Sequence, residues 1–242
     1  LDNLPVVVGT LHSMLTPFVA SYKRNNPDKK IAYIMTDGAA LPLYLSMNVK
    51  NLKQNGLIDS TITIGNAFGG DYECINIYTG LITAKEIAKA DVVFVSMGPG
   101  IAGTGTKYGF TGIEQGQILD AVKKLGGNPI AIPRISFADK RDRHQGISHH
   151  SITVFDKIVN VDVNIPITIY ESQKLNKIKE QIKENKLDEK HNIIFIENNK
   201  CKEDLEHFGL KVKSMGRNYD EDSEFFDSAS SAAYYLMEVC HD

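Results

Sequence analysis

The sequence contains no tryptophan and only three cysteines among its 242 residues. Cys74, Cys201 and Cys240 lie far apart and form no C-x-x-C pair. This pattern excludes a disulfide framework and a zinc knuckle built from cysteine pairs. Free thiols are typical of a reducing compartment, so we expect a cytoplasmic protein.

Long apolar runs and a strong net charge are also missing. No stretch approaches the roughly 20 apolar residues that a membrane-spanning helix needs, so no membrane span is expected. The 27 basic and 30 acidic residues leave a net charge of −3, which gives no general attraction to nucleic acid. Small-molecule partners are therefore favoured, and association into a homo-oligomer stays open.

The sequence is rich, by contrast, in alternating strand and helix patterns. Strand patterns cover residues 4–9, 31–35, 60–64, 91–97 and 128–133. Helix patterns begin near Thr16, cover 39–55 and 71–90, and run from 111 to the glycines at 126–127. Five such units in succession predict an α/β fold, a doubly wound, mostly parallel Rossmann-like sheet with helices on both faces. The length suits a single domain over residues 1–242.

The pattern changes after about residue 160, so we divide the domain into a core of βα units (1–160) and a second part (161–242). The second part reads as a lysine-rich surface helix over 172–185, a strand over 192–196, a helix over 201–208, a strand over 210–215 and a helix over 223–240. This part either extends the sheet or forms a small lobe beside it.

A glycine-rich turn follows the strand over 91–97, and it is the most unusual stretch of the chain. Its residues include Gly98, Gly100, Gly103, Thr104, Gly105 and Thr106. Glycines let a backbone expose successive N–H groups, which form a concave nest for phosphate or carboxylate. The letters G-x-G-x-x-G occur here, but the helix begins too late for a dinucleotide site and the acidic residue about twenty positions on, Asp120, lies within that helix. A long connection with no ligand is the alternative.

Other polar residues follow the remaining strands of the predicted sheet. Ligands of open parallel sheets bind outside the carboxyl ends of the strands. We therefore expect a ligand site at this edge, formed by the glycine-rich turn together with Thr10, His12, Asp37, Gly38, Gly70, Asp71, Arg134 and Arg143. Helix capping is the structural alternative for Asp37 and Asp71.

The segment from Arg134 to Ser151 is basic and holds three of the seven histidines. Guanidinium groups of Arg134 and Arg143 suit phosphate or carboxylate, although surface ion pairs with Asp139 or Asp142 are an alternative. RNA binding is disfavoured, because this loop has only Phe137 to stack on a base.

His144, His149 and His150 are candidate catalytic residues, together with Asp37 or Asp71. Histidine transfers protons near neutral pH and also binds zinc, iron or manganese. Three readings stay open: acid–base catalysis, a metal site completed by Asp37 or Asp71, and hydrogen bonding alone. Adjacent residues do not face the same way in regular structure, so we expect at most one of His149 and His150 to reach the site unless the segment is irregular.

Several long motifs resemble the bacterial family catalogued as domain of unknown function 3866. They are VVVGTLHSML (6–15), YIMTDGAALPL (33–43), FGGD (68–71), MGPGIAGTGTKYGFTGIEQG (97–116) and RHQGISHHS (143–151). The resemblance covers about 4–170 and is weaker after Ser172. It carries no activity that can be transferred to this chain, and the cofactor is left unknown. It also implies that members have a β-rich segment before the part that this chain represents.

These observations lead to three hypotheses. The first is an enzyme, a hydrolase or transferase, that acts on an anionic and nucleotide-like small molecule at the carboxyl edge of the sheet. The second is a non-catalytic sensor or regulatory domain that binds such a ligand. The third is a structural oligomer whose loops form a subunit contact.

Overall fold

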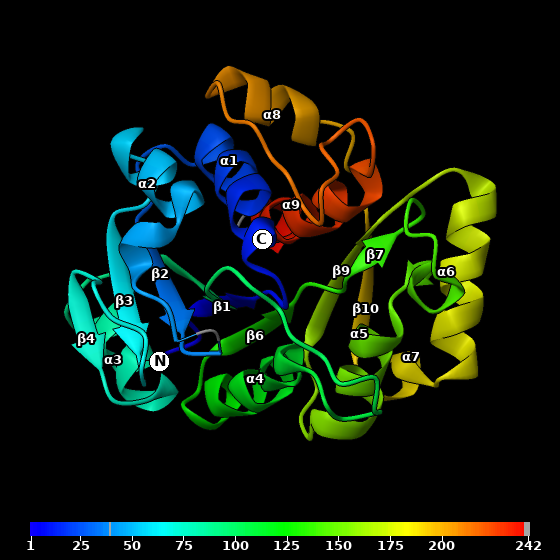
Figure 1. The fold of residues 1–242 in the computed structure, drawn as a ribbon, viewed down its shortest axis with the longest axis horizontal. Helices are drawn as coiled ribbons and strands as arrows, with labels where there is room; N and C mark the ends of the chain where they lie inside the picture. Colours follow the sequence, from blue (N-terminus) through cyan, green and yellow to red (C-terminus); the bar gives the residue numbers. More distant parts are fainter. Residues whose placement is uncertain (39, 240–242) are drawn as a thin grey trace.

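The protein is built around one eight-stranded parallel sheet (Figure 1). The computed structural model describes residues 1–38 and 40–239. The order of the strands across the sheet is β10 (Asn192–Ile196), β9 (Asn164–Thr168), β6 (Asn128–Ala131), β1 (Pro5–Val8), β5 (Val92–Met97), β2 (Ile31–Thr36), β3 (Ser60–Ile64) and β4 (Tyr72–Cys74). The predicted α/β class with a parallel sheet is confirmed, and β9 and β10 extend that sheet from the second part of the chain.

Helices cover both faces of the sheet. The side chains of β1 show how the two layers arise, since Val7 packs into one core and Val6 and Val8 into the other. One face carries α1 (Leu15–Asn25), α2 (Met47–Gln54), α8 (Cys201–His207) and α9 (Ser223–Val239). The other carries α3 (Ile77–Glu86), α4 (Glu114–Lys124), α5 (His149–Thr153), α6 (Ser172–Glu184) and α7 (Leu187–Lys190), with the π-helical turn η5 (Val154–Ile158) continuing α5.

The neighbouring strands β1 and β5 send the chain to opposite faces. From β1 it passes through η1 (His12–Met14) into α1, and from β5 it passes through η3 (Thr111–Ile113) into α4. The connections diverge at the carboxyl ends of these strands, which is where open parallel sheets place their ligand sites. The β6 connection enters the same region through the short hairpin of β7 (Ile135–Ser136) and β8 (Gly146–Ile147), with η4 (Asp142–His144) between them.

The helix predicted over 39–55 is shorter in the structure. Residue 39 lies outside the described part of the chain, η2 covers Leu43–Leu45, and α2 begins at Met47. Pro42 has no N–H to donate and disfavours helix in the residue before it. Ser46 then caps α2, because its Oγ accepts the N–H of Val49 at 3.0 Å.

The helix predicted over 71–90 is wrong at its start. Edge strand β4 occupies Tyr72–Cys74, and α3 begins at Ile77 with Asn76, not Asp71, as its cap. Because β4 runs parallel to β3, the chain must return to the amino-terminal side of the sheet before entering it. Gly70 and Asp71 therefore do not lie at the carboxyl edge, contrary to expectation.

The strand predicted over 210–215 does not form. Val212 is buried in the core beneath α8 and α9, and the segment ends in an isolated bridge between Ser214 and Arg217. The helix predicted over 223–240 is α9, which is described to Val239; Cys240 lies outside the described residues. Cys74 and Cys201 are free thiols. Among the helices of residues 1–38 and 40–239, none combines the length and the apolar character needed to span a bilayer.

Candidate functional site

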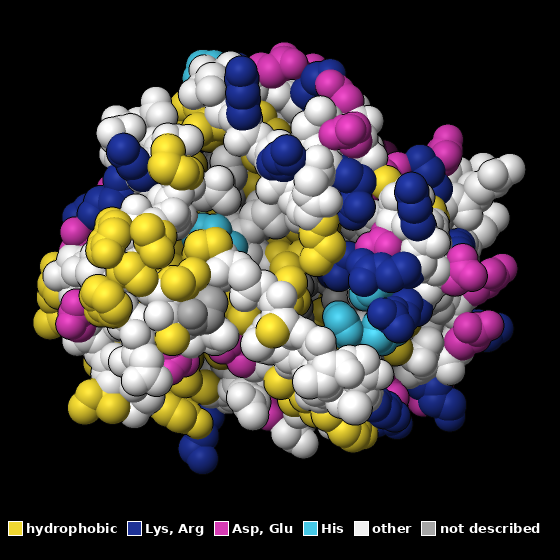
Figure 2. All heavy atoms as spheres, viewed as in Figure 1, with side chains coloured by type: hydrophobic (Ala, Val, Ile, Leu, Met, Phe, Trp, Pro, Cys, Tyr) yellow, Lys and Arg dark blue, Asp and Glu magenta, His cyan; other side chains and the backbone are white. Residues whose placement is uncertain are grey.

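A cavity of about 240 Å³ opens at the carboxyl edge of the sheet, between the connections that follow β5 and β6. Figure 2 shows its surface, where histidine side chains adjoin a group of Lys and Arg side chains. Its lining comes from three distant parts of the chain: Ile101, Ala102, Gly103, Gly105 and Thr106 from the glycine-rich turn, Arg134, Arg141, Arg143, His144, His149 and His150 from the basic segment, and Met215.

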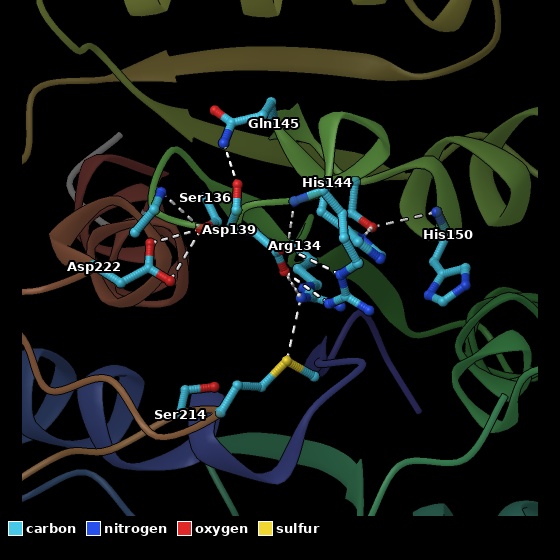
Figure 3. Close-up of polar contacts among 12 residues, drawn as sticks. Arg134, Ser136, Asp139, His144, Gln145, His150, Ser214 and Asp222 are labelled. Atoms are coloured by element: carbon cyan, nitrogen blue, oxygen red, sulfur yellow. Dashed lines mark hydrogen bonds and ion pairs between the residues drawn. The ribbon is translucent and has the colours of Figure 1, made fainter.

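Two of the three lining arginines share one buried carboxylate. Asp139 accepts a hydrogen bond from Nη2 of Arg134 at 3.1 Å (Figure 3). It also accepts two hydrogen bonds from Arg141, from Nε at 3.0 Å and from Nη2 at 2.8 Å. Arg134 and Asp139 are each about 5% exposed. The hydrogen bonds from Arg141 hold the pKa of Asp139 well below its usual range, so this carboxylate stays charged and fixes both guanidinium groups.

Arg143 has no carboxylate partner within the described residues and is exposed at the cavity. Three guanidinium groups therefore face one charge-compensating carboxylate, and the cavity wall is left with an excess of positive charge. Arg143 is a free, charged hydrogen-bond donor next to this excess, which suits an anionic group.

The rings of His144, His149 and His150 form a compact cluster. Their centroids are separated by 4.8 Å for His144 and His149, 5.3 Å for His144 and His150, and 4.1 Å for His149 and His150. The expectation that at most one of the adjacent pair reaches the site is therefore wrong. Both residues lie in the first turn of α5, and both rings lie against that of His144.

Ser148 and Phe110 hold this cluster in place. The Oγ of Ser148 lies 2.7 Å from Nδ1 of His144, and it also accepts the backbone N–H of His150 at 3.3 Å. The Phe110 ring stacks on His150 with centroids 4.1 Å apart and planes 10° from parallel. The histidine rings are thus oriented by a buried hydroxyl at one side and an aromatic ring at the other.

The environment keeps the three histidines neutral. Burial lowers the pKa of His144 from 6.5 to about 3, and the charges of Arg134 and Arg141 lower it further. Burial and the neighbouring charges lower the pKa of His150 to about 4, and burial and Arg143 lower the pKa of His149. At neutral pH these rings offer lone pairs rather than positive charges.

The glycine-rich turn forms the opposite wall. Pairing of Ala102 with Thr111 and of Thr104 with Gly109 closes it into a loop. Within the described chain, the N–H groups of Gly103 and Gly105 have no protein acceptor. Between Ala102 and Thr106 these unbonded N–H groups alternate with bonded ones, and both belong to residues that line the cavity.

Gly109 sets the shape of this loop, and the sequence reasoning overlooked it. A Cβ at this position would lie 2.0 Å from Oγ1 of Thr104 and 2.4 Å from Oγ1 of Thr106. These two hydroxyls are 2.9 Å apart and hydrogen-bonded to each other. Only glycine allows them to meet beneath the loop. Gly98 and Gly100 belong to the same turn but do not line the cavity.

Met215 forms a lip over the cavity. The sequence did not indicate it as a site residue. Its Sδ lies 3.2 Å from Nη2 of Arg134, and its backbone is left-handed, with φ of 48°. This conformation is unfavourable for a residue with a side chain. The surrounding turn is held by Ser13, whose hydroxyl donates to Oγ of Ser214 at 2.9 Å.

A buried carboxylate ties this lip to the strand next to it. Asp222 accepts a hydrogen bond from Oγ of Ser136 at 2.8 Å (Figure 3). It also accepts one from Nε of Arg217 at 2.9 Å. Burial raises the pKa of Asp222. The only signal for Met215 in the sequence is that Ser-Met-Gly occurs both at 96–98 and at 214–216, and this repeat predicts no contact.

The structure places Thr10 and His12 in the protein interior, away from the cavity. His12 is about 8% exposed, with Nδ1 3.0 Å from the hydroxyl of Tyr33 and Nε2 2.6 Å from that of Ser46. Burial lowers the pKa of His12 to about 4. The hydroxyl of Thr10 is also buried and points to the sulfur of Met14. Neither residue lines the cavity.

Asp37 lies at a second cavity of about 230 Å³, between the carboxyl ends of β2 and β3. Its carboxylate accepts the N–H and the side-chain amide of Asn66, at 3.1 and 3.0 Å. Glu114 shares this cavity and accepts the hydroxyl of Thr36 at 2.6 Å. Burial, together with the charge of Asp37, raises the pKa of Glu114. The neighbouring Gly38 approaches Met97 so closely that a Cβ would lie 2.6 Å from its methyl group.

Asp71 is occupied elsewhere. Its carboxylate accepts a hydrogen bond from Nζ of Lys53 at 2.7 Å. It also accepts hydrogen bonds from the N–H and the hydroxyl of Thr61, each at 2.8 Å. Gly70 lies against the backbone of β3, where a Cβ would be 2.9 Å from the nitrogen of Thr63. The structure thus brings neither Asp37 nor Asp71 to the histidine cluster.

The chain belongs to the family described as Protein of unknown function (DUF3866), whose model matches residues 1–233. The resemblance seen in the motifs is therefore confirmed. It also extends beyond residue 170, so the weaker likeness that we expected after Ser172 does not mark the end of the match. No curated protein and no solved structure matches the chain.

Proposed function

We propose that this member of the family is an enzyme, a hydrolase or transferase, that binds a small anionic ligand in the cavity between the glycine-rich turn and the basic segment. The observation that carries the proposal is the excess of guanidinium groups over carboxylates in the cavity wall, with Arg143 free of any ion partner among the described residues. Fixed positive charge in a partly enclosed space favours phosphate or carboxylate over neutral groups.

The size of the cavity supports an anionic head group. A volume of about 240 Å³ lies below the roughly 300–1,000 Å³ typical of sites for drug-sized ligands. It suits a phosphoryl or carboxyl group with a few adjoining atoms, while the remainder of a nucleotide-like molecule would extend outside. The N–H groups of Gly103 and Gly105 supply neutral donors opposite the arginines.

The enzymatic part of the proposal rests on the neutral histidine cluster beside the anion-binding wall. A pocket that only senses an anion needs its positive charges, but it does not need three unprotonated imidazoles. Lone pairs next to a bound phosphoryl or carboxyl group are the arrangement that hydrolysis and group transfer use.

The test combines binding with turnover. Calorimetric titration with inorganic sulfate should show binding to the wild-type protein, weakened on the order of 10-fold in Arg143→Gln because one charge-assisted hydrogen bond is lost. Arg24→Gln is the matched control, since Arg24 is an exposed residue of α1 whose guanidinium contacts His207 at the surface. A panel of nucleotides and sugar phosphates should then yield released phosphate or transferred product.

Equal sulfate affinity in the wild type and Arg143→Gln would contradict the anion site. Saturable ligand binding without product from any ligand that binds would instead favour a sensor or regulatory domain, which is the second hypothesis.

A further inference from the structure

We propose that His144, His149 and His150 form a binding site for one divalent metal ion, with zinc as the best fit, and that its open coordination position faces the arginines of the cavity. The proposal deepens the proposed function, because it assigns a role to the histidine cluster of the same cavity. Metal binding can nevertheless be measured without any substrate.

The geometry of the cluster comes first. One nitrogen from each of the three rings lies within 4.8 Å of the other two. Tetrahedral zinc with bonds of about 2.0–2.1 Å holds its nitrogens roughly 3.3 Å apart. Small rotations of the rings, drawing the nitrogens closer by up to about 1.5 Å, would complete such a site. His149 and His150 are half-buried and line the cavity, whereas His144 is buried, so this adjustment falls mainly to the first two rings.

The hydrogen-bond pattern leaves ring nitrogens without partners. Nε2 of His149 and Nδ1 of His150 are buried and have no hydrogen-bond partner among residues 1–38 and 40–239. Buried polar atoms are rarely left unpaired, because the loss of their hydration is not compensated. In His144, Nδ1 is taken by Ser148, which leaves Nε2 as the remaining nitrogen. A metal ion would satisfy all three rings at once.

The contact between His144 and Ser148 is of the kind that supports metal ligands. A ligating histidine usually bonds a second group through its other ring nitrogen, which fixes the tautomer and the orientation of the ring. Three histidines are also a ligand set that leaves zinc a fourth position for water or substrate, where the ion activates water or polarises an oxygen. No carboxylate is needed to complete the set, so the positions of Asp37 and Asp71 do not weaken it.

The charge around the cluster predicts what occupies the fourth position. A dication beside Arg134, Arg141 and Arg143 would meet repulsion that Asp139 alone does not balance. An anion that bridges the metal and the arginines removes this repulsion. Zinc and an oxyanion should therefore strengthen each other's binding, since the coupling between two ligands is reciprocal.

The experiment uses the full chain after treatment with a chelator. Zinc titrated against a chromogenic chelator should bind the wild-type protein at one ion per chain. Replacement of a ligand, as His149→Asn or His150→Asn, should lower zinc affinity by at least about 100-fold, which exceeds the effect usual for outer groups. His207→Asn is the matched control, because His207 is an exposed histidine on α8 and should leave the affinity unchanged.

Two further measurements keep the proposal falsifiable if a variant fails to fold. The wild-type protein loaded with cobalt should show the intense visible bands of four- or five-coordinate ligation by nitrogen. Added sulfate should tighten zinc binding in the wild type, and tighten it less in Arg143→Gln.

The absence of stoichiometric zinc, or equal affinity in the wild type and both ligand variants, would overturn the site. Sulfate that leaves zinc affinity unchanged would overturn the placement of the open position. If zinc does not bind but sulfate does, the metal site fails and the anion site stands. If zinc binds but no substrate is turned over, the metal site stands and the proposed enzyme fails.

Discussion

The hydroxyl of Ser148 lies 2.7 Å from Nδ1 of His144, and no part of Ser148 is exposed to solvent. The same oxygen accepts the backbone N–H of His150 and caps α5. One buried atom thus orients the first histidine of the cluster and fixes the backbone that carries the other two.

Replacing Ser148 by alanine should therefore affect the cluster more than the fold. We expect zinc affinity to fall about 10- to 100-fold, as is usual when a group that orients a metal ligand is removed. The loss of a helix cap should lower the free energy of unfolding by about 1 kcal/mol. Titration with zinc and urea denaturation measure the two effects separately.

Ser46 offers a matched control for this change. It is likewise buried, caps α2 through the N–H of Val49 and contacts a histidine, His12, but it does not line the cavity. Ser46→Ala should lower stability by a similar amount and leave zinc affinity as it is. If both alanine variants weaken zinc binding equally, Ser148 acts only through the fold.

Asp139→Asn should destabilise the protein strongly. Asp139 is the carboxylate that compensates Arg134, and both side chains are about 5% exposed. Removing one charge of a buried pair leaves the other without a partner, so we expect the free energy of unfolding to fall by on the order of 3 kcal/mol. Denaturant unfolding at neutral pH measures this difference.

The control for Asp139 is Asp220→Asn. Asp220 pairs with Lys202 at 2.7 Å, but the two side chains are 71% and 50% exposed. Solvent screens such a pair, so its loss should change the free energy of unfolding by less than about 1 kcal/mol. Similar losses in both variants would mean that the Arg134–Asp139 pair is not buried as described.

His12 should make the protein sensitive to acid. Its pKa is lowered to about 4 in the folded protein by burial, whereas the unfolded chain binds the proton near 6.5. The unfolded state therefore holds more protons between these values, and stability falls as the pH drops from 6.5 towards 4. Protonation of His12 should lower the free energy of unfolding by on the order of 3 kcal/mol once the pH lies below both pKa values.

Unfolding measured at several pH values tests this expectation. His12→Gln should reduce the slope of stability against pH in that window, whatever its stability at pH 7. The three histidines of the cavity also resist protonation, so part of the slope should persist in His12→Gln. An unchanged slope would show that His12 is not the group concerned.

The sequence was sufficient to predict the central strands of the sheet. In β2 and β5 every residue is buried, and such continuous apolar runs between glycine- or proline-containing turns are the strongest signal of a parallel sheet. The edge strand β4 gave no such signal, because two of its three residues are exposed. Asp71 next to it resembled a helix cap, and this local resemblance led to the wrong start for α3.

The candidate site was predictable only in part, for a related reason. The order of strands brings the glycine-rich turn and the basic segment to one edge, and the rule for parallel sheets places both there. Side-chain direction is not contained in that rule. It does not indicate that His149 and His150 turn to the same side or that Thr104 and Thr106 need Gly109 between them. It also gives no reason why Met215, at the end of a predicted strand that does not form, should contact Arg134.

That contact joins the cavity to a turn that is translated after its histidines and arginines. Helix α9 follows this turn and supplies much of the core on its face of the sheet, so the lip at Met215 should reach its final position only once that helix has packed. Closure of the cavity mouth and completion of this core are therefore expected to be coupled during folding.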